Sequence, residues 1–122
     1  MVVKLHDAEL RVMSVIWKNG EITASRIAEE LKEKFDYSKT TTYTLIKRCL
    51  TKGAIKRTDP GFYCSALVTR EQAQELELSE LVDKLYDGAT DMLVASILAD
   101  KKLSPEEAER LRRFVNEWSE LN

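Results

Sequence analysis

Hydroxyl and basic side chains are concentrated in residues 37–62, which read YSKTTTYTLIKRCLTKGAIKRTDPGF. No acidic residue lies between Asp36 and Asp59, and the cations in that interval are Lys39, Lys47, Arg48, Lys52, Lys56 and Arg57. Ammonium and guanidinium groups bind phosphate oxygens, while threonine hydroxyl and methyl groups suit phosphates, base edges and the methyl group of thymine. The residue types therefore indicate contact with a polyanion such as DNA.

Helical periodicity places most of these side chains on one helix. Ser38 is a good N-cap, and Gly53 stops a helix that we expect to run to about Lys52. At about 3.6 residues per turn, one face holds Thr42, Leu45, Ile46, Cys49 and Leu50. Roughly opposite lie Thr40, Thr44, Lys47 and Thr51. The outer face therefore combines a basic side chain with short threonine side chains.

Two short β-favouring runs follow, AIKRT and FYCSA, separated by Asp59-Pro60-Gly61. Pro at i+1 and Gly at i+2 fit a type II turn, although a longer hairpin loop is compatible with these residues. We expect a hairpin of residues 55–58 and 62–66 that lies along the DNA backbone. The predicted DNA-binding residues are Ser38, Lys39, Thr40, Thr41, Tyr43, Thr44, Lys47, Arg48, Lys56 and Arg57.

The preceding segment predicts two more helices. Residues 8–19 follow Asp7 as a candidate N-cap and end before Gly20, and residues 24–35 follow Thr23 as the next N-cap. Three helices followed by a hairpin is the order of a winged helix-turn-helix. The expected fold is therefore mainly α with a small β-hairpin.

From Glu71 onward the pattern is helical again and the charge reverses. Residues 1–70 carry 13 Lys and Arg against 8 Asp and Glu, a net charge of +5, whereas residues 71–122 carry 6 against 13, a net charge of −7. We therefore expect a winged-helix DNA-binding domain in residues 1–70 and a helical dimerisation arm in residues 71–122. The last helix should open at Ser104-Pro105, with Glu107 completing a capping box.

The C-terminal helices carry more apolar side chains than a small winged helix can cover. Each large apolar side chain that is buried contributes roughly 1.5–3 kcal/mol, so an interface between two copies is favoured. The predicted dimerisation residues are Leu78, Leu81, Leu85, Met92, Leu93, Ile97, Leu98, Leu111, Phe114 and Trp118. The alternative is that these side chains pack onto the N-terminal domain as ordinary core.

Composition excludes several function classes. The 122 residues are 43% hydrophobic and 33% charged, as in an ordinary globular protein, and no apolar run of membrane-spanning length occurs. Asp7 and Glu9 interrupt the N-terminus before a secretory apolar segment forms, so a cytoplasmic protein is expected. Cys49 and Cys64 are expected to be buried, and His6 is the only histidine, so we predict no metal site, no cofactor and no enzymatic activity.

The main rival function is a winged helix that binds another protein without sequence-specific DNA recognition. Such a module predicts an apolar or mixed outer face on the third helix. The outer face here is basic and hydroxylated, which favours DNA.

Three stretches resemble a known family, the penicillinase and methicillin-resistance repressors, with the copper-responsive repressors as relatives. They are DAELRVMSVIWKNGEITASRIAEEL, YSKTTTYTLIKRCLTKGAIKR and LYDGATDMLVASILADKKLSPEEAERL. The resemblance covers essentially the whole chain. It implies a homodimeric bacterial transcriptional repressor that binds a dyad-symmetric operator, with recognition-helix positions at Ser38, Thr41 and Thr44.

The resemblance also implies a partner, a sensor or protease that relieves repression. In members tied to β-lactam sensing, cleavage falls at an Asn-Phe pair, and the aligned positions here are Ser96-Ile97. The copper branch carries a C-terminal C-x-C cluster, whereas this sequence ends RRFVNEWSELN. Neither signal is therefore expected to act by the family's route.

Overall fold

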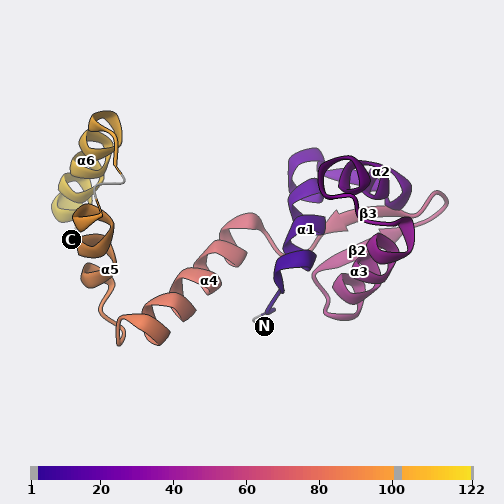
Figure 1. The fold of residues 1–122 in the computed structure, drawn as a ribbon, viewed down its shortest axis with the longest axis horizontal. Coiled ribbons are helices and arrows are strands. Elements are labelled where there is room, and N and C mark those ends of the chain that lie inside the picture. The colour runs from indigo at the N-terminus through magenta and orange to yellow at the C-terminus, as the bar shows by residue number, and fades with distance from the viewer. Residues whose placement is uncertain (1–2, 101–102, 122) are drawn as a thin grey trace. The chain divides into compact units, whose positions relative to one another are not determined.

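The computed structural model describes residues 3–100 and 103–121, and Figure 1 shows the order of its elements. They are α1 (Asp7–Asn19), β1 (Glu21–Thr23), α2 (Ala24–Phe35), α3 (Lys39–Thr51), β2 (Ile55–Thr58), β3 (Tyr63–Ala66), α4 (Arg70–Leu85), α5 (Thr90–Ala99) and α6 (Pro105–Leu121). The fold is mainly helical with a small antiparallel sheet. This confirms the predicted fold class.

The first three helices and the sheet enclose one apolar core. Its buried side chains include Val12, Met13 and Ile16 from α1, and Ile27 and Leu31 from α2. From α3 the core receives Leu45, Ile46 and Cys49, and Thr42 of the same helix is also buried. The predicted inward face of α3 is therefore confirmed, so its opposite face is left to solvent.

The sheet has the strand order β1-β3-β2, and both pairings are antiparallel. β1 was not expected from the sequence. It has only three residues and pairs with a strand far along the chain, Ile22 lying opposite Cys64. Three residues cannot establish a period, so tertiary pairing rather than local pattern makes this segment a strand.

The hairpin loop is longer than a two-residue turn. Thr58 pairs with Tyr63, which leaves residues 59–62 in the loop. Gly61 and Phe62 both have positive φ, 103° and 53°, whereas a type II turn has one such residue. A Cβ at Gly61 would lie 2.9 Å from Cε2 of Tyr63, so this loop requires glycine there.

Helix starts agree with the expected capping residues except at α1. His6, not Asp7, is the N-cap of α1, and the backbone N–H of His6 donates to Oε1 of Glu9 at 2.8 Å. Glu9 is buried, so its carboxylate lies where it can reach back to the first turn. The predicted cap of α2 is confirmed, since Oγ1 of Thr23 accepts from the Arg26 backbone N–H at 3.2 Å.

The chain divides into two compact units, residues 1–78 and 79–122. The start of α4 belongs to the first unit. Nε1 of Trp17 donates to the Val68 carbonyl at 2.8 Å, Thr69 and Gln72 form a capping box, and Ala73 is buried. The functional division at residue 70 stays a prediction, while the structural boundary lies within α4.

The second unit contains the end of α4, α5 and α6. Ser104 and Glu107 form the expected capping box of α6: the Glu107 backbone N–H donates to Oγ of Ser104 at 3.1 Å, and the Ser104 backbone N–H donates to Oε1 of Glu107 at 3.0 Å. No residue of α5 or α6 that the structure describes is buried. These helices therefore expose apolar side chains that a folded chain normally covers.

Candidate nucleic-acid interface

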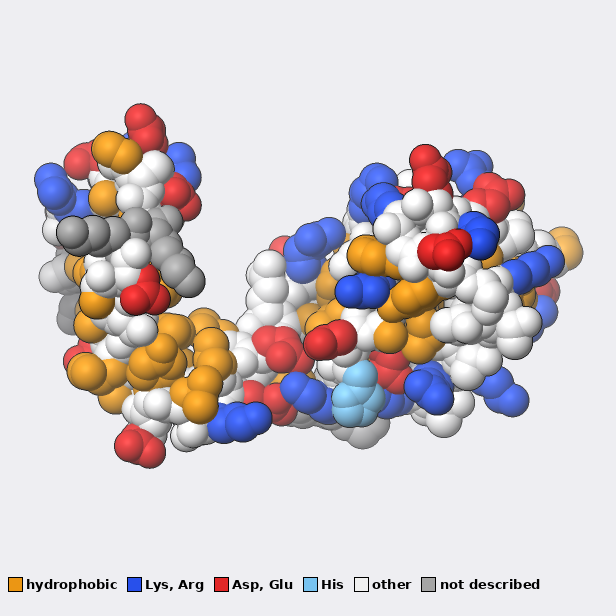
Figure 2. All heavy atoms as spheres, viewed as in Figure 1, with side chains coloured by type: hydrophobic (Ala, Val, Ile, Leu, Met, Phe, Trp, Pro, Cys, Tyr) orange, Lys and Arg blue, Asp and Glu red, His pale blue; other side chains and the backbone are white. Residues whose placement is uncertain are grey.

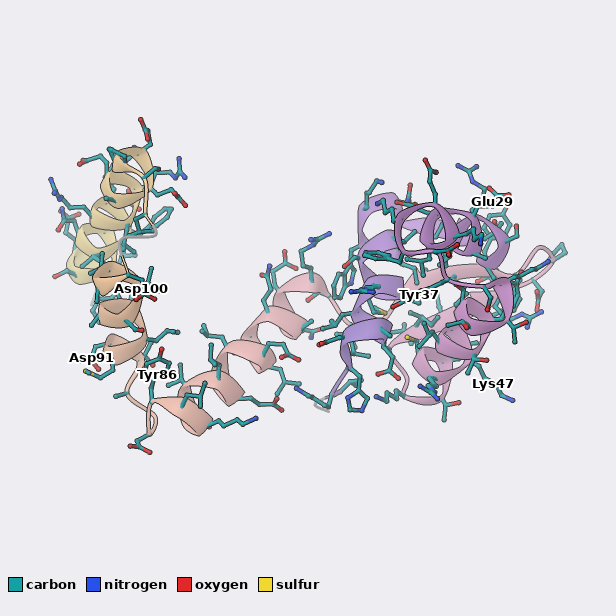
Figure 3. All side chains as sticks on the ribbon, in the orientation of Figure 1. Glu29, Tyr37, Lys47, Tyr86, Asp91 and Asp100 are labelled. Carbon is teal, nitrogen blue, oxygen red and sulfur yellow. The ribbon has the colours of Figure 1, made fainter. Side chains whose placement is uncertain are left out.

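The outer face of α3 presents the side chains that the sequence analysis selected. Ser38 and, within α3, Lys39, Thr40, Thr41, Thr44, Lys47 and Arg48 are exposed, and Tyr43 is half-buried. In Figure 3 the Lys47 side chain extends away from the helix. Lys56 and Arg57 are exposed on β2. The structure thus brings all these residues to the surface of one unit.

Two shallow hollows lie along this face, with Thr44 and Lys47 lining both. The first is completed by Lys39, Thr40 and Tyr43. The second is completed by Arg48, Thr51, Lys52, His6 and Glu9. Because Thr44 and Lys47 lie between the hollows, they are the side chains best placed to meet a ligand laid along α3.

Ser38 and Thr41 differ from the other hydroxyl residues because they bond to each other. Oγ of Ser38 accepts from the Thr41 backbone N–H at 3.1 Å and donates to Oγ1 of Thr41 at 2.9 Å. The Ser38 hydroxyl therefore serves as the N-cap, as predicted from its position. The Thr41 hydroxyl still has a proton to donate to an acceptor on a ligand.

Aromatic rings connect α3 to the hairpin. The rings of Tyr43 and Phe62 meet edge to face, with centroids 5.9 Å apart and planes at 85°. The ammonium of Lys39 lies 5.7 Å from the Tyr43 centroid, and the guanidinium of Arg57 lies 3.6 Å from the Phe62 centroid. The sequence analysis missed Phe62, since a single aromatic residue after Pro-Gly gives no sign of where its ring will lie.

Arg57 is also engaged by an acidic neighbour. Its Nε donates to both carboxylate oxygens of Asp59, at 3.1 and 3.0 Å. Oδ1 of Asp59 accepts in addition from the Phe62 backbone N–H at 3.2 Å. The positive charge of the hairpin is therefore reduced at its loop, and Lys56 is the hairpin cation outside this arrangement.

Lys52, one of the six cations in the basic stretch, has a structural role. Its Nζ donates to Oε1 of Glu9 at 2.6 Å and to the Lys4 carbonyl at 2.8 Å. Burial raises the pKa of Glu9, but the backbone N–H of His6 and the Lys52 ammonium outweigh it and hold that pKa below its ordinary value. Lys52 thus neutralises a buried carboxylate of the core.

The two cysteines are buried and free, as expected. Burial raises the pKa of Cys49 to about 12, and burial also raises the pKa of Cys64. Burial therefore disfavours the thiolate form of both side chains, which is the form that acts as a nucleophile. Among residues 3–100 and 103–121, no three His, Cys, Asp or Glu side chains are placed to hold a metal ion.

The predicted dimerisation residues lie largely on the surface. Leu78, Leu81, Leu85, Met92, Ile97, Leu98, Phe114 and Trp118 are exposed, and Leu93 and Leu111 are half-buried. Figure 2 shows hydrophobic side chains at the surface over the end of α4 and α5. Val115 and Leu121 of α6 are also exposed and were not in the predicted set.

No helix in the described part of the chain has the length and apolar character needed to span a membrane.

Comparison with known proteins identifies the family. The model of the penicillinase repressor family matches residues 5–117. The penicillinase repressor of Bacillus licheniformis is 28% identical over 118 residues, which cover 95% of this chain and 92% of the relative. The methicillin resistance regulatory protein MecI of Staphylococcus aureus (strain N315) is 31% identical over 115 residues, with 93% and 94% covered.

Solved structures agree with this assignment. The solution structure of the DNA-binding domain of the repressor BlaI is 30% identical, has a TM-score of 0.55, and covers 59% of this chain and 90% of its own. The structure of the Bacillus licheniformis BlaI monomeric form in complex with the blaP half-operator has a TM-score of 0.53 with the same identity and coverage. The chain belongs to the penicillinase repressor family.

Proposed function

We propose that this protein is a transcriptional repressor that binds double-stranded operator DNA through α3 and the β2–β3 hairpin. The observation that carries the proposal is the exposed outer face of α3, which is made of threonines and cations while the opposite face is buried. The similarity to BlaI, whose structure was solved with a half-operator, supports it. Because a bacterial repressor acts on DNA inside the cell, we also propose a cytoplasmic location.

The dimensions of α3 suit the major groove of DNA, which admits one α-helix. Thr40, Thr44 and Lys47 are spaced by four and three residues and so follow one another along a single helix face. We assign Thr40, Thr44 and Lys47 to the groove and Lys39, Arg48 and Lys56 to the flanking phosphates. Short threonine side chains allow the helix backbone to approach the bases closely.

The C-terminal helices supply the second half of the proposal, a homodimer. Leucine and aromatic side chains of α5 and α6 are exposed, for example Leu98 at 51% and Phe114 at 62%. A second copy of the same surface would cover them. Two copies read two half-sites, and the net charge of −7 in residues 71–122 keeps this half away from phosphates.

Relief of repression then follows from loss of the dimer. One copy retains the contacts of a single half-site, whereas two linked copies bind far more tightly because the second contact is intramolecular. We propose that a sensor or a protease acts on residues 79–122 to separate the copies. Ser96 and Ile97 of α5 stand where the family's cleavage pair is expected, so we assign the signal to a route other than cleavage of an Asn-Phe bond.

A protein-binding winged helix remains the alternative function, and the outer face of α3 argues against it. Apart from the half-buried Tyr43, this face carries threonines and cations. Protein interfaces are usually depleted of lysine and rich in apolar groups at their centre. The surface composition therefore supports DNA as the partner.

The test uses a duplex selected from a random pool for binding to the full chain. Lys47→Ala should weaken binding roughly tenfold. Because both residues are assigned to the groove, Lys47→Ala and Thr44→Ala should each relax the preference at one base position. Lys84→Ala, the same charge change on exposed α4, is the matched control and should bind like the parent. If both α3 variants bound the duplex as tightly and as selectively as the parent, the assignment of Thr44 and Lys47 to the DNA contact would be wrong.

A further inference from the structure

Phe62, in the hairpin loop, has a backbone conformation that phenylalanine rarely adopts. Its φ is 53°, in the left-handed region where glycine and asparagine are at ease and a bulky residue is strained. Such strain persists only where the surroundings hold it in place. Here the Phe62 backbone N–H donates to Oδ1 of Asp59 at 3.2 Å, and its carbonyl accepts from the Ala24 backbone N–H at 2.9 Å.

Any residue at position 62 could make these backbone hydrogen bonds, whereas the contacts of the side chain depend on an aromatic ring. The Phe62 ring has two contacts. It meets the ring of Tyr43 of α3 edge to face, with the centroids 5.9 Å apart, and the guanidinium of Arg57 of β2 lies 3.6 Å from its centroid. Lys39 extends the series, 5.7 Å from the Tyr43 centroid. A cation, two neighbouring rings and a second cation therefore form one continuous series from the first turn of α3 to the hairpin.

We propose that Phe62 is a positioning residue that fixes the hairpin against α3, so that both present their cations to DNA as one rigid surface. The inference rests on the DNA-binding function proposed above. With the ring in place, Lys56 stands at a fixed offset from Thr44 and Lys47. A surface that is already ordered loses less conformational freedom on binding, which raises affinity without adding a contact to the bases.

The test compares Phe62→Gly with Phe62→Tyr in the full chain. Glycine accepts the left-handed backbone and deletes the ring, so the loop can keep its path. Affinity for the selected duplex should fall about tenfold, and the salt dependence should fall by about one released counterion as Lys56 of the hairpin loses its phosphate. Phe62→Tyr retains the ring, so its affinity and its salt dependence should equal those of the parent.

Phe35→Ala is the matched control. Phe35 is an exposed ring that also carries a guanidinium, that of Arg11 at 4.1 Å from its centroid, but it lies at the end of α2. Its removal should leave affinity and salt dependence unchanged. For every variant, thermal unfolding of the free protein checks that it folds, and its mass in solution checks that its oligomeric state is unchanged.

Tyr43→Leu removes the α3 half of the same contact and should reproduce the loss of salt dependence, which keeps the test valid if Phe62→Gly folds poorly. Parent affinity and salt dependence in the folded ring-deleted variants would overturn the inference. So would an affinity loss with an unchanged salt dependence, since the hairpin phosphate contacts would then be intact. Failure of the parent itself to bind any selected duplex would instead reject the proposed function.

Discussion

The cations of residues 37–58 fall into groups with different roles. Lys52 neutralises the buried Glu9, and Arg57 is held by Asp59. Lys39, Lys47, Arg48 and Lys56 lie outside these two ion pairs. The net charge of the stretch therefore overstates what DNA meets, because formal charge in a sequence does not reveal which cations are engaged within the fold.

Asp59 limits the affinity of the hairpin for phosphate. In Asp59→Asn the amide oxygen can still accept from the Phe62 backbone N–H, but one negative charge is gone and Arg57 is released. We expect binding to tighten about fivefold, roughly 1 kcal/mol, with the salt dependence rising by about one counterion. Fluorescence anisotropy across a salt series measures both. Weaker binding would show that the carboxylate is needed to shape the loop.

Lys52 and Glu9 should control stability rather than DNA binding. Glu9 is 1% exposed, so Lys52→Met leaves a buried carboxylate without its cation and should lower the free energy of unfolding by about 3 kcal/mol. Lys56→Met, the same change on exposed β2, should alter it by less than about 0.5 kcal/mol. Urea unfolding monitored by circular dichroism compares the two. Equal effects would contradict the structural role of Lys52.

The lowered pKa of Glu9 also predicts how stability depends on pH. A carboxyl whose pKa is lower in the folded state than its ordinary value of 4.5 contributes stability above pH 4.5. That contribution is lost as the pH falls through the folded-state pKa. Unfolding of the parent between neutral and acidic pH should show the loss, and Glu9→Gln should show a shallower decline. An unchanged decline in Glu9→Gln would place the acid sensitivity on other carboxyl groups.

At the scale of elements, periodicity and capping signals were sufficient for α1, α2, α3, α6 and the hairpin. The inward face of α3 and the capping residues Thr23, Ser38 and Ser104 followed from local sequence. What could not be predicted depends on distant contacts. β1 becomes a strand only because β3 lies beside it, and the extent of the first unit into α4 depends on Trp17 and Val68.

The candidate site shows the same division. The exposed residues of α3 could be predicted, since a helix with one buried face exposes the other. The Phe62 ring, the Asp59 ion pair and the Lys52–Glu9 pair could not, because each depends on where a turn or a second element places its side chain.

Ser38 should act mainly through the start of α3. Its hydroxyl caps the helix and bonds to Thr41, so Ser38→Ala should lower the free energy of unfolding by about 1 kcal/mol in the absence of DNA. Ser38→Asn also caps and should remain close to the parent. Thermal unfolding of the free protein provides the measurement. Full stability in Ser38→Ala, with DNA binding lost, would return Ser38 to the role of a direct contact.

For the whole molecule, the charge division and the exposed apolar helices support the proposed dimer, in which two basic domains are joined through acidic arms. The apolar surface is concentrated where the net charge is negative, in residues 79–122. In the proposed dimer, an interface there would bring two winged helices to one DNA molecule. Specificity then comes from the pair, since each copy reads few base pairs.

Leu98→Asp should separate the copies. A charge on this surface would be buried without a partner in the dimer, so the sedimentation coefficient should fall to that of a monomer and DNA binding should weaken. Leu67→Asp is the control, because Leu67 is an apolar side chain of similar exposure, 55% against 51%, in the first unit. The Leu67 variant should stay dimeric. If the Leu98 variant stayed dimeric, the proposed location of the interface at Leu98 would be wrong.

The most direct test of the dimeric repressor is selection of bound duplexes from a random DNA pool, followed by measurement of the number of protein copies on the recovered duplex by sedimentation. The account predicts a sequence with dyad symmetry carrying two copies. Recovery of no preferred sequence, or of an asymmetric site occupied by one copy, would contradict it.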